Sequence, residues 1–356
     1  MSNILDYLDW RDITFKQDKF NEVDNLILSR IAYFPLDNIV PENEKITLKY
    51  AYENLENKEK PEIYLQREDK DLFFKLAKSK RFGRILLSDY INIISQEEEK
   101  QFSVLTIELP DGTMYISYRG TDNTIVGWKE DLNMSFQDLV PSQIEAVNYL
   151  EKIAKKTRKQ IRIGGHSKGG NLAVYAAAFC NINTKGRILE VYNNDGPGFQ
   201  NNVIKSKEYK EIRSRIHTYL PQTSIIGRLL TQKGKNTIIK STQTGIMQHD
   251  LYSWQVLGNK FVKSEFTNAS QFIDNTITEW LKEVSVQKRE KTIDIIFEIL
   301  NATGVKTLSE MNTKRFTNAK TILMTYKNID SESKKIVLET LKVLLKIAIK
   351  RENKVD

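Results

Sequence analysis

The sequence predicts an α/β fold in which a mainly parallel central sheet carries helical additions at both ends of the chain. From Ile85 onward, β-rich runs alternate with apolar residues at helical spacing, whereas the first eighty residues and those after about residue 268 have mainly helical patterns. Consecutive strands joined by helices pair in parallel. We therefore expect a helical segment over residues 1–80 packed on the core, an α/β core over residues 81–267, and a helical region over residues 268–356 that caps the core or acts as a lid.

The composition argues against several classes of function. The 356-residue chain is 40% hydrophobic and 28% charged, which is typical of a protein with a large core. Its net charge of +8 comes from lysines spread along the chain, without a basic stripe of interleaved aromatic residues, so we expect no nucleic-acid partner. One cysteine and three scattered histidines do not suit a disulfide or a metal site, so we expect no metal and no cofactor. Without a secretory signal or an apolar run of about 18 residues, the sequence predicts a cytoplasmic protein.

Two predicted helices precede the first β-rich runs. Apolar residues recur at helical spacing from Phe20 to Phe34, and a shorter helix is predicted from Asp69 to Ala77. The β-rich runs that follow lie at residues 90–94, 102–109 and 114–118. The turn Pro110-Asp111-Gly112 joins the last two runs and predicts a hairpin.

The parallel part of the sheet is predicted by the next segments. A helix from Pro141 to Lys159 leads into a strand that begins at Ile161, and a small, apolar helix follows from Asn171 to Phe179. Further strands are predicted at residues 188–193, 212–220 and 237–241. This alternation of strand and helix indicates a parallel sheet.

Two helices are predicted in the C-terminal region. The first covers residues 293–300 and ends at Asn301-Ala302-Thr303-Gly304. The second runs from Ser333 to Lys350 and places lysines at i, i+4 spacing beside apolar residues: Lys342, Lys346 and Lys350 with Leu341, Leu344, Leu345 and Ile349. A basic amphipathic helix of this kind can make peripheral contact with a membrane. The alternative is a terminal helix that packs on the core with its lysines in water.

A candidate nucleophile lies between the strand at Ile161 and the following helix. Gly165-His166-Ser167-Lys168-Gly169 matches G-x-S-x-G, the pattern of a nucleophile elbow, and Gly170 extends the run of small residues. In an elbow the glycines allow a turn so sharp that the serine hydroxyl projects above the sheet. The strand-turn-helix context predicts that Ser167 is a nucleophile of an α/β-hydrolase fold.

A serine hydroxyl needs a general base, and chain order selects among the three histidines. In α/β-hydrolases the partners follow in the order serine, acid, histidine, which excludes His166. His217 lies within an alternating strand pattern, where a structural histidine is the ordinary interpretation. His249 lies beyond the last predicted strand and before Tyr252-Ser253-Trp254, so we predict it as the base.

The acid that orients this base is predicted on a loop at a strand end. Asp195 follows the strand at 188–193 and lies in the turn Asn194-Asp195-Gly196-Pro197-Gly198-Phe199. The alternative interpretation is that Asp195 only caps this turn. Asp250 is a second candidate, although adjacent side chains in a loop seldom pair as a triad requires. We predict the catalytic triad Ser167, Asp195 and His249.

The oxyanion of an acyl-transfer intermediate also needs hydrogen-bond donors. One donor is expected to be the amide of Lys168, which follows the nucleophile. A second is expected from Thr121 in Tyr118-Arg119-Gly120-Thr121, because this segment ends a predicted strand. The alternative for this segment is an ordinary β-turn.

These segments together resemble the class 3 lipases. In that family a strand, an oxyanion loop, a tryptophan and an aspartate precede a G-H-S-x-G elbow, as Tyr118-Arg119-Gly120-Thr121, Trp128 and Asp131 precede Gly165-His166-Ser167-Lys168-Gly169 here. Further segments are similar to a bacterial family of uncharacterised lipase-like α/β-hydrolases; they are Asn3 to Trp10, Val23 to Tyr33, Asn194 to Phe199, Leu220 to Gly227 and Gln248 to Trp254. The resemblance implies hydrolysis of carboxylic esters of lipids or small molecules.

The chain departs from the class 3 pattern at the acid. Class 3 lipases place it in an Asn-Asp segment before a Val-Pro-like turn, whereas the corresponding residues 221–227 here contain Ser224. Other lipases place the acid one strand earlier, which suits Asp195.

Two further classes of function stay open: a non-catalytic binding protein with a hydrolase fold, and a module that docks on a membrane or partner through its C-terminal helix.

Overall fold

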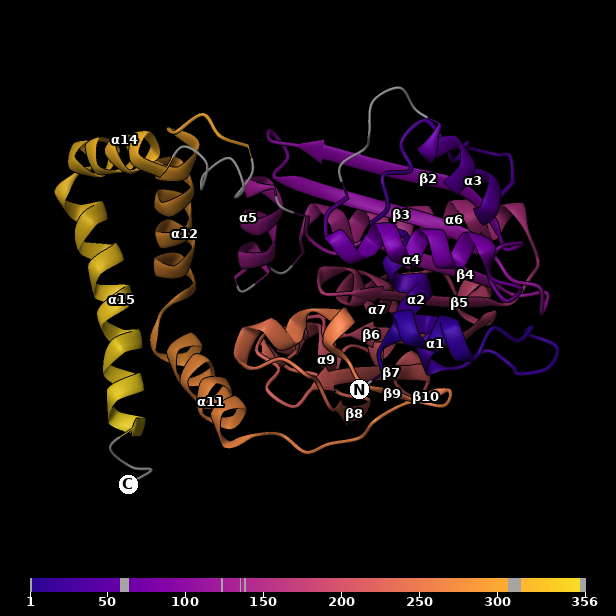
Figure 1. Cartoon of the computed structure of the whole chain (residues 1–356). Helices are drawn as coiled ribbons and strands as arrows, with labels where there is room; N and C mark the ends of the chain where they lie inside the picture. The colour runs from indigo at the N-terminus through magenta and orange to yellow at the C-terminus, as the bar shows by residue number, and fades with distance from the viewer. Residues whose placement is uncertain are drawn as a thin grey trace. The chain divides into compact units, whose positions relative to one another are not determined.

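The computed structural model describes residues 2–57, 64–122, 124–134, 136–137, 139–306 and 315–352 (Figure 1). The chain divides into two compact units. The first consists of Met1–Ile93, Phe102–Gly120 and Ser142–Thr267. The second consists of Ile94–Gln101, Thr121–Pro141 and Asn268–Asp356. Residues 2–57 and 64–80 therefore belong to the same unit as most of the sheet.

The sheet has eight strands that lie side by side in chain order. They are β1 Ile46–Thr47, β2 Leu86–Ser95, β3 Lys100–Glu108, β4 Met114–Tyr118, β5 Ile161–His166, β6 Ile188–Asn194, β7 Ile216–Pro221 and β8 Lys235–Ile239. Strands β4 to β8 pair in parallel, whereas β3 pairs with β4 and β1 with β2 in antiparallel fashion. A separate antiparallel pair is formed by β9 Val256–Leu257 and β10 Lys260–Phe261. The mainly parallel sheet, flanked by helices, confirms the predicted α/β-hydrolase fold class.

Each predicted strand is present, but some bounds were wrong: β2 begins at Leu86 and not at Tyr90, and β8 ends at Ile239 and not at Ser241. The strand predicted from Ile212 begins only at Ile216, because helix α10 (Lys207–Ile212) and a 3₁₀ turn at Arg213–Arg215 occupy the preceding residues. The hydroxyl of Ser206 accepts a hydrogen bond from the amide of Tyr209 and caps this helix. A local cap thus takes precedence over the alternating pattern that predicted a longer strand.

Helices cover both faces of the sheet within the first unit (Figure 1). One face packs against α1 Ile4–Trp10, α2 Glu22–Ile31, α3 Leu48–Glu56 and α4 Arg67–Lys78, and the other against α6 Pro141–Lys156, α7 Lys168–Phe179 and α10. The strands contribute alternate residues to the two cores: Tyr115 and Tyr192 face the N-terminal helices, whereas Ile116 and Val191 face the opposite core. The first unit also contains two short helices, α8 Ile182–Lys185 and α9 Asn201–Lys205.

The second unit is helical in its described part. Its helices are α5 Ile125–Asn133, α11 Asn268–Glu283, α12 Val286–Asn301, α14 Arg315–Asn328 and α15 Ser331–Glu352. Ile125, Ile293 and Phe297 are buried together in its core. As predicted, α12 ends at Asn301, and Gly304 just beyond it has φ +70°. That this region caps the core or acts as a lid stays a prediction.

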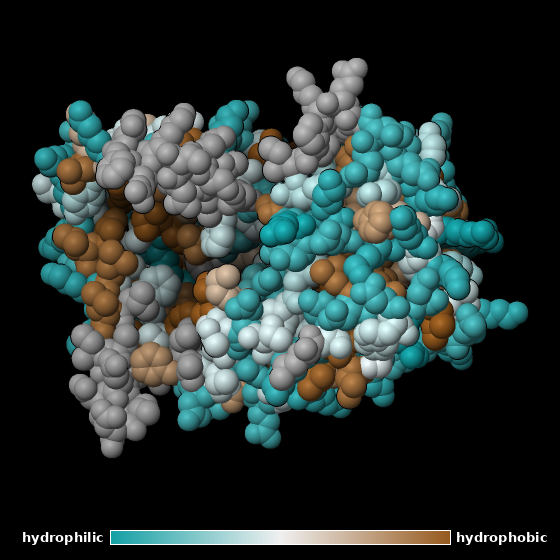
Figure 2. Space-filling view, in the orientation of Figure 1, coloured by the Kyte–Doolittle hydropathy of each residue, from teal (hydrophilic) through white to brown (hydrophobic). Residues whose placement is uncertain are grey.

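The last helix, α15, covers the predicted range Ser333 to Lys350. Val337, Thr340 and Ile347 on it are buried, whereas Leu341 and Leu345 are exposed. Figure 2 shows apolar side chains on the surface of this unit. The side chains of Leu344, Ile349 and Lys350 lie outside the described part. Among the described residues, no helix has both the length and the apolar character needed to cross a membrane.

Candidate active site

Ser167 occupies a strained turn between β5 and α7. Its backbone has φ 59° and ψ −135°, a conformation that non-glycine residues rarely adopt and that is common at functional sites. The flanking glycines are required by close packing: a Cβ on Gly165 would lie 2.4 Å from the backbone of Gly169, and one on Gly169 would lie 2.1 Å from the carbonyl oxygen of Tyr118. The strand-turn-helix context predicted for the elbow is therefore present.

His249 and Asp195 are in direct contact. Nδ1 of His249 lies 2.7 Å from Oδ2 of Asp195. The other carboxylate oxygen of Asp195 accepts hydrogen bonds from the hydroxyl of Ser224 at 2.5 Å and from the amide of Gly227 at 3.2 Å. Asp195 is buried, and the side chain of His249 is 26% exposed. A carboxylate at Nδ1 favours the tautomer whose Nε2 is free to accept a proton.

The turn that carries Asp195 is held against helix α7. Asp195 itself has φ 53°, and its amide donates to the carbonyl oxygen of Tyr219 on β7. Asn171, in the first turn of α7, donates to the carbonyl oxygens of Pro197 at 3.2 Å and Gly198 at 2.9 Å. These bonds fix the Asp195 turn relative to the turn at Ser167.

His166 holds the backbone of the His249 loop. Its Nε2 lies 2.8 Å from the carbonyl oxygen of His249, and the two imidazole rings are 4.6 Å apart. Burial, then the nearby His249 and Arg30, lowers the pKa of His166 well below its ordinary value. Because the carbonyl can only accept, the neutral ring carries its proton on Nε2. Because His166 directly precedes Ser167, this hydrogen bond ties the turn at Ser167 to the backbone of His249.

The other candidates make different contacts. His217, on β7, stacks on Tyr192 and lies 3.7 Å from the carboxylate of Glu190. Asp250 accepts hydrogen bonds from the amide of Tyr252 at 3.1 Å and from Gln66 at 3.4 Å. The structure therefore brings Asp195, and not Asp250, to the ring nitrogen of His249.

Tyr33, just beyond α2, is a residue that sequence analysis missed. Its hydroxyl accepts a hydrogen bond from the amide of Gly120 at 2.8 Å and donates to the carbonyl oxygen of His166 at 3.1 Å. It thereby joins the end of β4 to the turn that holds Ser167. The guanidinium of Arg30, which forms a buried ion pair with Asp69, lies 4.4 Å from the centre of the Tyr33 ring. The sequence signal for this cluster was that polar residues, Arg30 among them, interrupt the apolar helical pattern of residues 20–34.

The two predicted oxyanion donors belong to different units of the chain. Lys168 is the first residue of α7 and directly follows Ser167. Thr121 belongs to the second unit, where its hydroxyl donates to Asp131. Gly120 belongs to the first unit, and its amide is bonded to Tyr33. The roles of Lys168 and Thr121 in an oxyanion hole remain predictions.

Comparison with known proteins identifies the family. The sequence model of the Mbeg1-like family matches residues 76–298, which contain Ser167, Asp195 and His249. The chain belongs to the Mbeg1-like family. No curated protein matches the sequence of this Mbeg1-like chain significantly.

Two solved structures to which this Mbeg1-like protein is similar are fungal lipases. A fungal lipase-inhibitor complex, described as a model for interfacial activation, is 14% identical, with a TM-score of 0.33 over 44% of this chain and 65% of that chain. The native propeptide complex of Rhizomucor miehei lipase is 12% identical, with a TM-score of 0.35 over 49% of this chain and 69% of that chain. The Mbeg1-like chain thus spans about two thirds of the length of these lipases.

Proposed function

We propose that this Mbeg1-like protein is a serine hydrolase that cleaves carboxylic esters, with Ser167, Asp195 and His249 as its catalytic triad. The observation that carries the proposal is the 2.7 Å contact between Asp195 and Nδ1 of His249. The amide of Ser167, which lies in a strained turn between closely packed glycines, donates a 3.0 Å hydrogen bond to the carbonyl oxygen of Asn194, the residue before Asp195. A nucleophile, a base and an orienting acid are the three parts that acyl transfer requires.

In the proposed reaction, Ser167 attacks the ester carbonyl while Nε2 of His249 takes its proton. The carboxylate of Asp195, supported by the hydrogen bonds of Ser224 and Gly227, stabilises the imidazolium that forms. The imidazolium then protonates the leaving alcohol. Water activated by the same ring hydrolyses the acyl-enzyme and releases the acid. Lys168 and Thr121 are the proposed donors to the oxyanion.

The proposed substrates are esters of lipids or of small molecules. Pocket shape and contacts with the acyl and alcohol groups decide among lipase, thioesterase and related activities. A screen of short-chain and long-chain esters and thioesters separates these possibilities.

The experiment that tests the proposal is labelling of the purified full chain with a fluorophosphonate probe. Wild type is compared with Ser167→Ala and His249→Ala, and His217→Ala is the control for loss of a histidine outside the triad. We expect an adduct at Ser167 by mass spectrometry, retained in His217→Ala and absent from the other two variants. An unlabelled but folded wild-type protein would contradict the proposal and favour a non-catalytic binding protein.

A further inference from the structure

A cavity of about 1300 Å³ lies in the first unit, away from the candidate triad. Arg162 and Glu190, which line it, are near the beginnings of β5 and β6, whereas Ser167 and Asp195 follow the ends of the same strands. Five residues of extended chain from Arg162 to Ser167 span roughly 17 Å. The cavity and the triad therefore lie at opposite edges of the parallel sheet.

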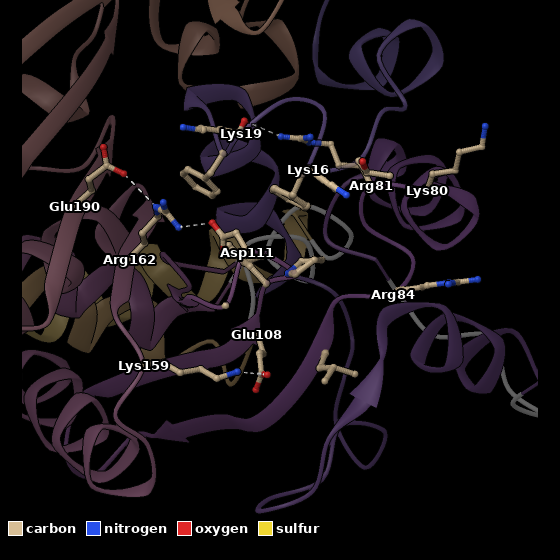
Figure 3. A pocket seen from close by; sticks show the side chains of 17 residues that line it. Lys16, Lys19, Lys80, Arg81, Arg84, Glu108, Asp111, Lys159, Arg162 and Glu190 are labelled. Carbon is tan, nitrogen blue, oxygen red and sulfur yellow. Dashed lines mark hydrogen bonds and ion pairs between the residues drawn. The ribbon is translucent and has the colours of Figure 1, made fainter.

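The lining of this cavity is rich in cations, with seven lysines and arginines and three acidic residues. All three acids are already paired on one side (Figure 3). Arg162 bridges Asp111 at 3.0 Å and Glu190 at 3.2 Å, and Lys159 pairs with Glu108. No carboxylate of the lining is therefore left to pair with the other lining cations.

Four cations form no side-chain hydrogen bond or ion pair with another described residue: Lys16, Lys19, Lys80 and Arg84. Figure 3 shows Lys80 and Arg84 extending away from the paired acids, on the other side of the cavity. The carboxylate of Asp12 is near Lys80, but it already accepts hydrogen bonds from the amides of Lys80 and Arg81.

Arg81 clamps together the two segments that carry these cations. It is itself buried and paired with buried Asp24. Its guanidinium donates to the carbonyl oxygens of Ile13 at 3.0 Å, Asp18 at 2.9 Å and Lys19 at 3.1 Å. The loop with Lys16 and Lys19 is thus fastened to the turn with Lys80 and Arg84. Arg81 thus joins the two backbone segments whose lysines and arginine line the same cavity.

We propose that this cavity binds an organic phosphate that carries at least two negative charges. Phosphate oxygens accept charge-assisted hydrogen bonds from several lysines and arginines at once. Apolar residues beside the cations, among them Leu86, Leu109 and Pro110, leave room for the organic part of the ligand. The phosphate can belong to a soluble phosphorylated compound or to a phospholipid headgroup, which is the same recognition chemistry from two sources.

The test measures binding by isothermal titration calorimetry with three probes: pyrophosphate, ATP and a short-chain phosphatidic acid kept below its micelle concentration. The variant is the triple substitution Lys16→Gln, Lys80→Gln and Arg84→Gln. The matched control is Lys205→Gln, Lys210→Gln and Lys240→Gln, which removes three exposed charges elsewhere in the same unit. We expect the dissociation constant of the bound probe to rise at least about tenfold in the first triple and less than about twofold in the control.

The probe that binds identifies the source of the phosphate. Binding of pyrophosphate or ATP indicates a soluble compound, and binding of phosphatidic acid alone indicates a lipid headgroup. Failure of all three probes, or an equal loss in both triples, would overturn the proposal. Thermal unfolding checks that the variants fold. If the triple variant does not fold, the single substitution Arg84→Gln of an exposed residue replaces it. Ser167→Ala is expected to bind like wild type, so this result is independent of the proposed hydrolase activity.

Discussion

The hydroxyl of Ser224 donates a hydrogen bond of 2.5 Å to the carboxylate of Asp195. Ser224 lies in the segment where the class 3 resemblance places the acid. Here its hydroxyl instead bonds to Asp195, which follows the preceding strand, β6. Replacing Ser224 by Ala leaves one oxygen of Asp195 with only the amide of Gly227.

We expect Ser224→Ala to slow fluorophosphonate labelling by about tenfold and to lower the free energy of unfolding by about 1–3 kcal/mol, because a buried carboxylate loses a donor. Ser241→Ala is the control, since that buried hydroxyl bonds to Ser253 away from Asp195. Restoration of labelling by Ser224→Thr would support the interpretation. Equal labelling rates for Ser224→Ala and Ser241→Ala would contradict it.

Asp195→Asn tests the contact with His249 directly. Asparagine tolerates the positive φ of this position, so the backbone turn should persist. We expect the labelling rate to fall by about three to four orders of magnitude, because an amide neither selects the required tautomer nor stabilises the imidazolium. Asp250→Asn, the neighbouring acid bonded to Gln66 and Tyr252, should retain labelling. The reverse pattern would assign the acid to Asp250.

Tyr33→Phe tests the bridge between Gly120 and the elbow. Loss of the hydroxyl leaves the amide of Gly120 and the carbonyl oxygen of His166 without this partner. We expect kcat for ester hydrolysis to fall about tenfold with little change in KM, because an interaction that positions the reacting groups is lost. Tyr115→Phe is the control, since that buried hydroxyl bonds to Asn25 on α2. A purely structural role for Tyr33 would give similar stability losses in both variants and leave kcat unchanged.

His166 makes stability depend on pH. Its pKa is lowered, by burial first and then by His249 and Arg30, so the unfolded chain takes up a proton at pH values where the folded protein does not. The free energy of unfolding should therefore fall as the pH decreases below about 6.5, by at most about 1.4 kcal/mol per pH unit from this residue. Urea unfolding from about pH 7.5 to about pH 5 measures this slope.

We expect His166→Gln to have a shallower slope than wild type over this pH range. His217→Gln is the matched histidine control. Burial also lowers the pKa of His217, but the carboxylate of Glu190 opposes the shift. A wild-type slope in His166→Gln would show that the ring titrates in the folded state as it does in the unfolded chain.

We propose that the exposed face of α15 makes peripheral contact with membranes. Leu338, Leu341 and Leu345 are exposed at i, i+3 and i+7 spacing, with Lys342 and Lys346 also exposed on the helix. We expect the full chain to sediment with anionic vesicles. Substitution of all three leucines by serine should abolish this co-sedimentation. Ser substitution of the exposed Leu323 and Met324 on α14 is the control. Failure of the wild type to sediment would favour a helix that only packs within its unit.

Local sequence patterns predicted the strands of the parallel sheet and the residue types of the site, but only two of the four helices described before β2 and two of the four described after residue 267. The alternation of strand and helix from Ile85 to Ser241 depends on nearby residues, and so does the Gly165-to-Gly169 turn, whose glycines are needed for a close backbone approach. The same patterns placed His249 after the last strand of the large sheet, although it ends a 3₁₀ turn, Gly245–His249, and the short pair β9 and β10 follows it. These features could be predicted because they are set within one or two turns of the chain.

Only the tertiary structure decided which of these residues meet. The contact of Asp195 with His249, the support from Ser224, and the hydrogen bonds of His166 and Tyr33 join segments that are distant in sequence. The cavity lined by Lys16, Lys19, Lys80 and Arg84 likewise depends on the buried guanidinium of Arg81, which joins two separate segments. Strand register and helix packing set these distances, and no local period records them.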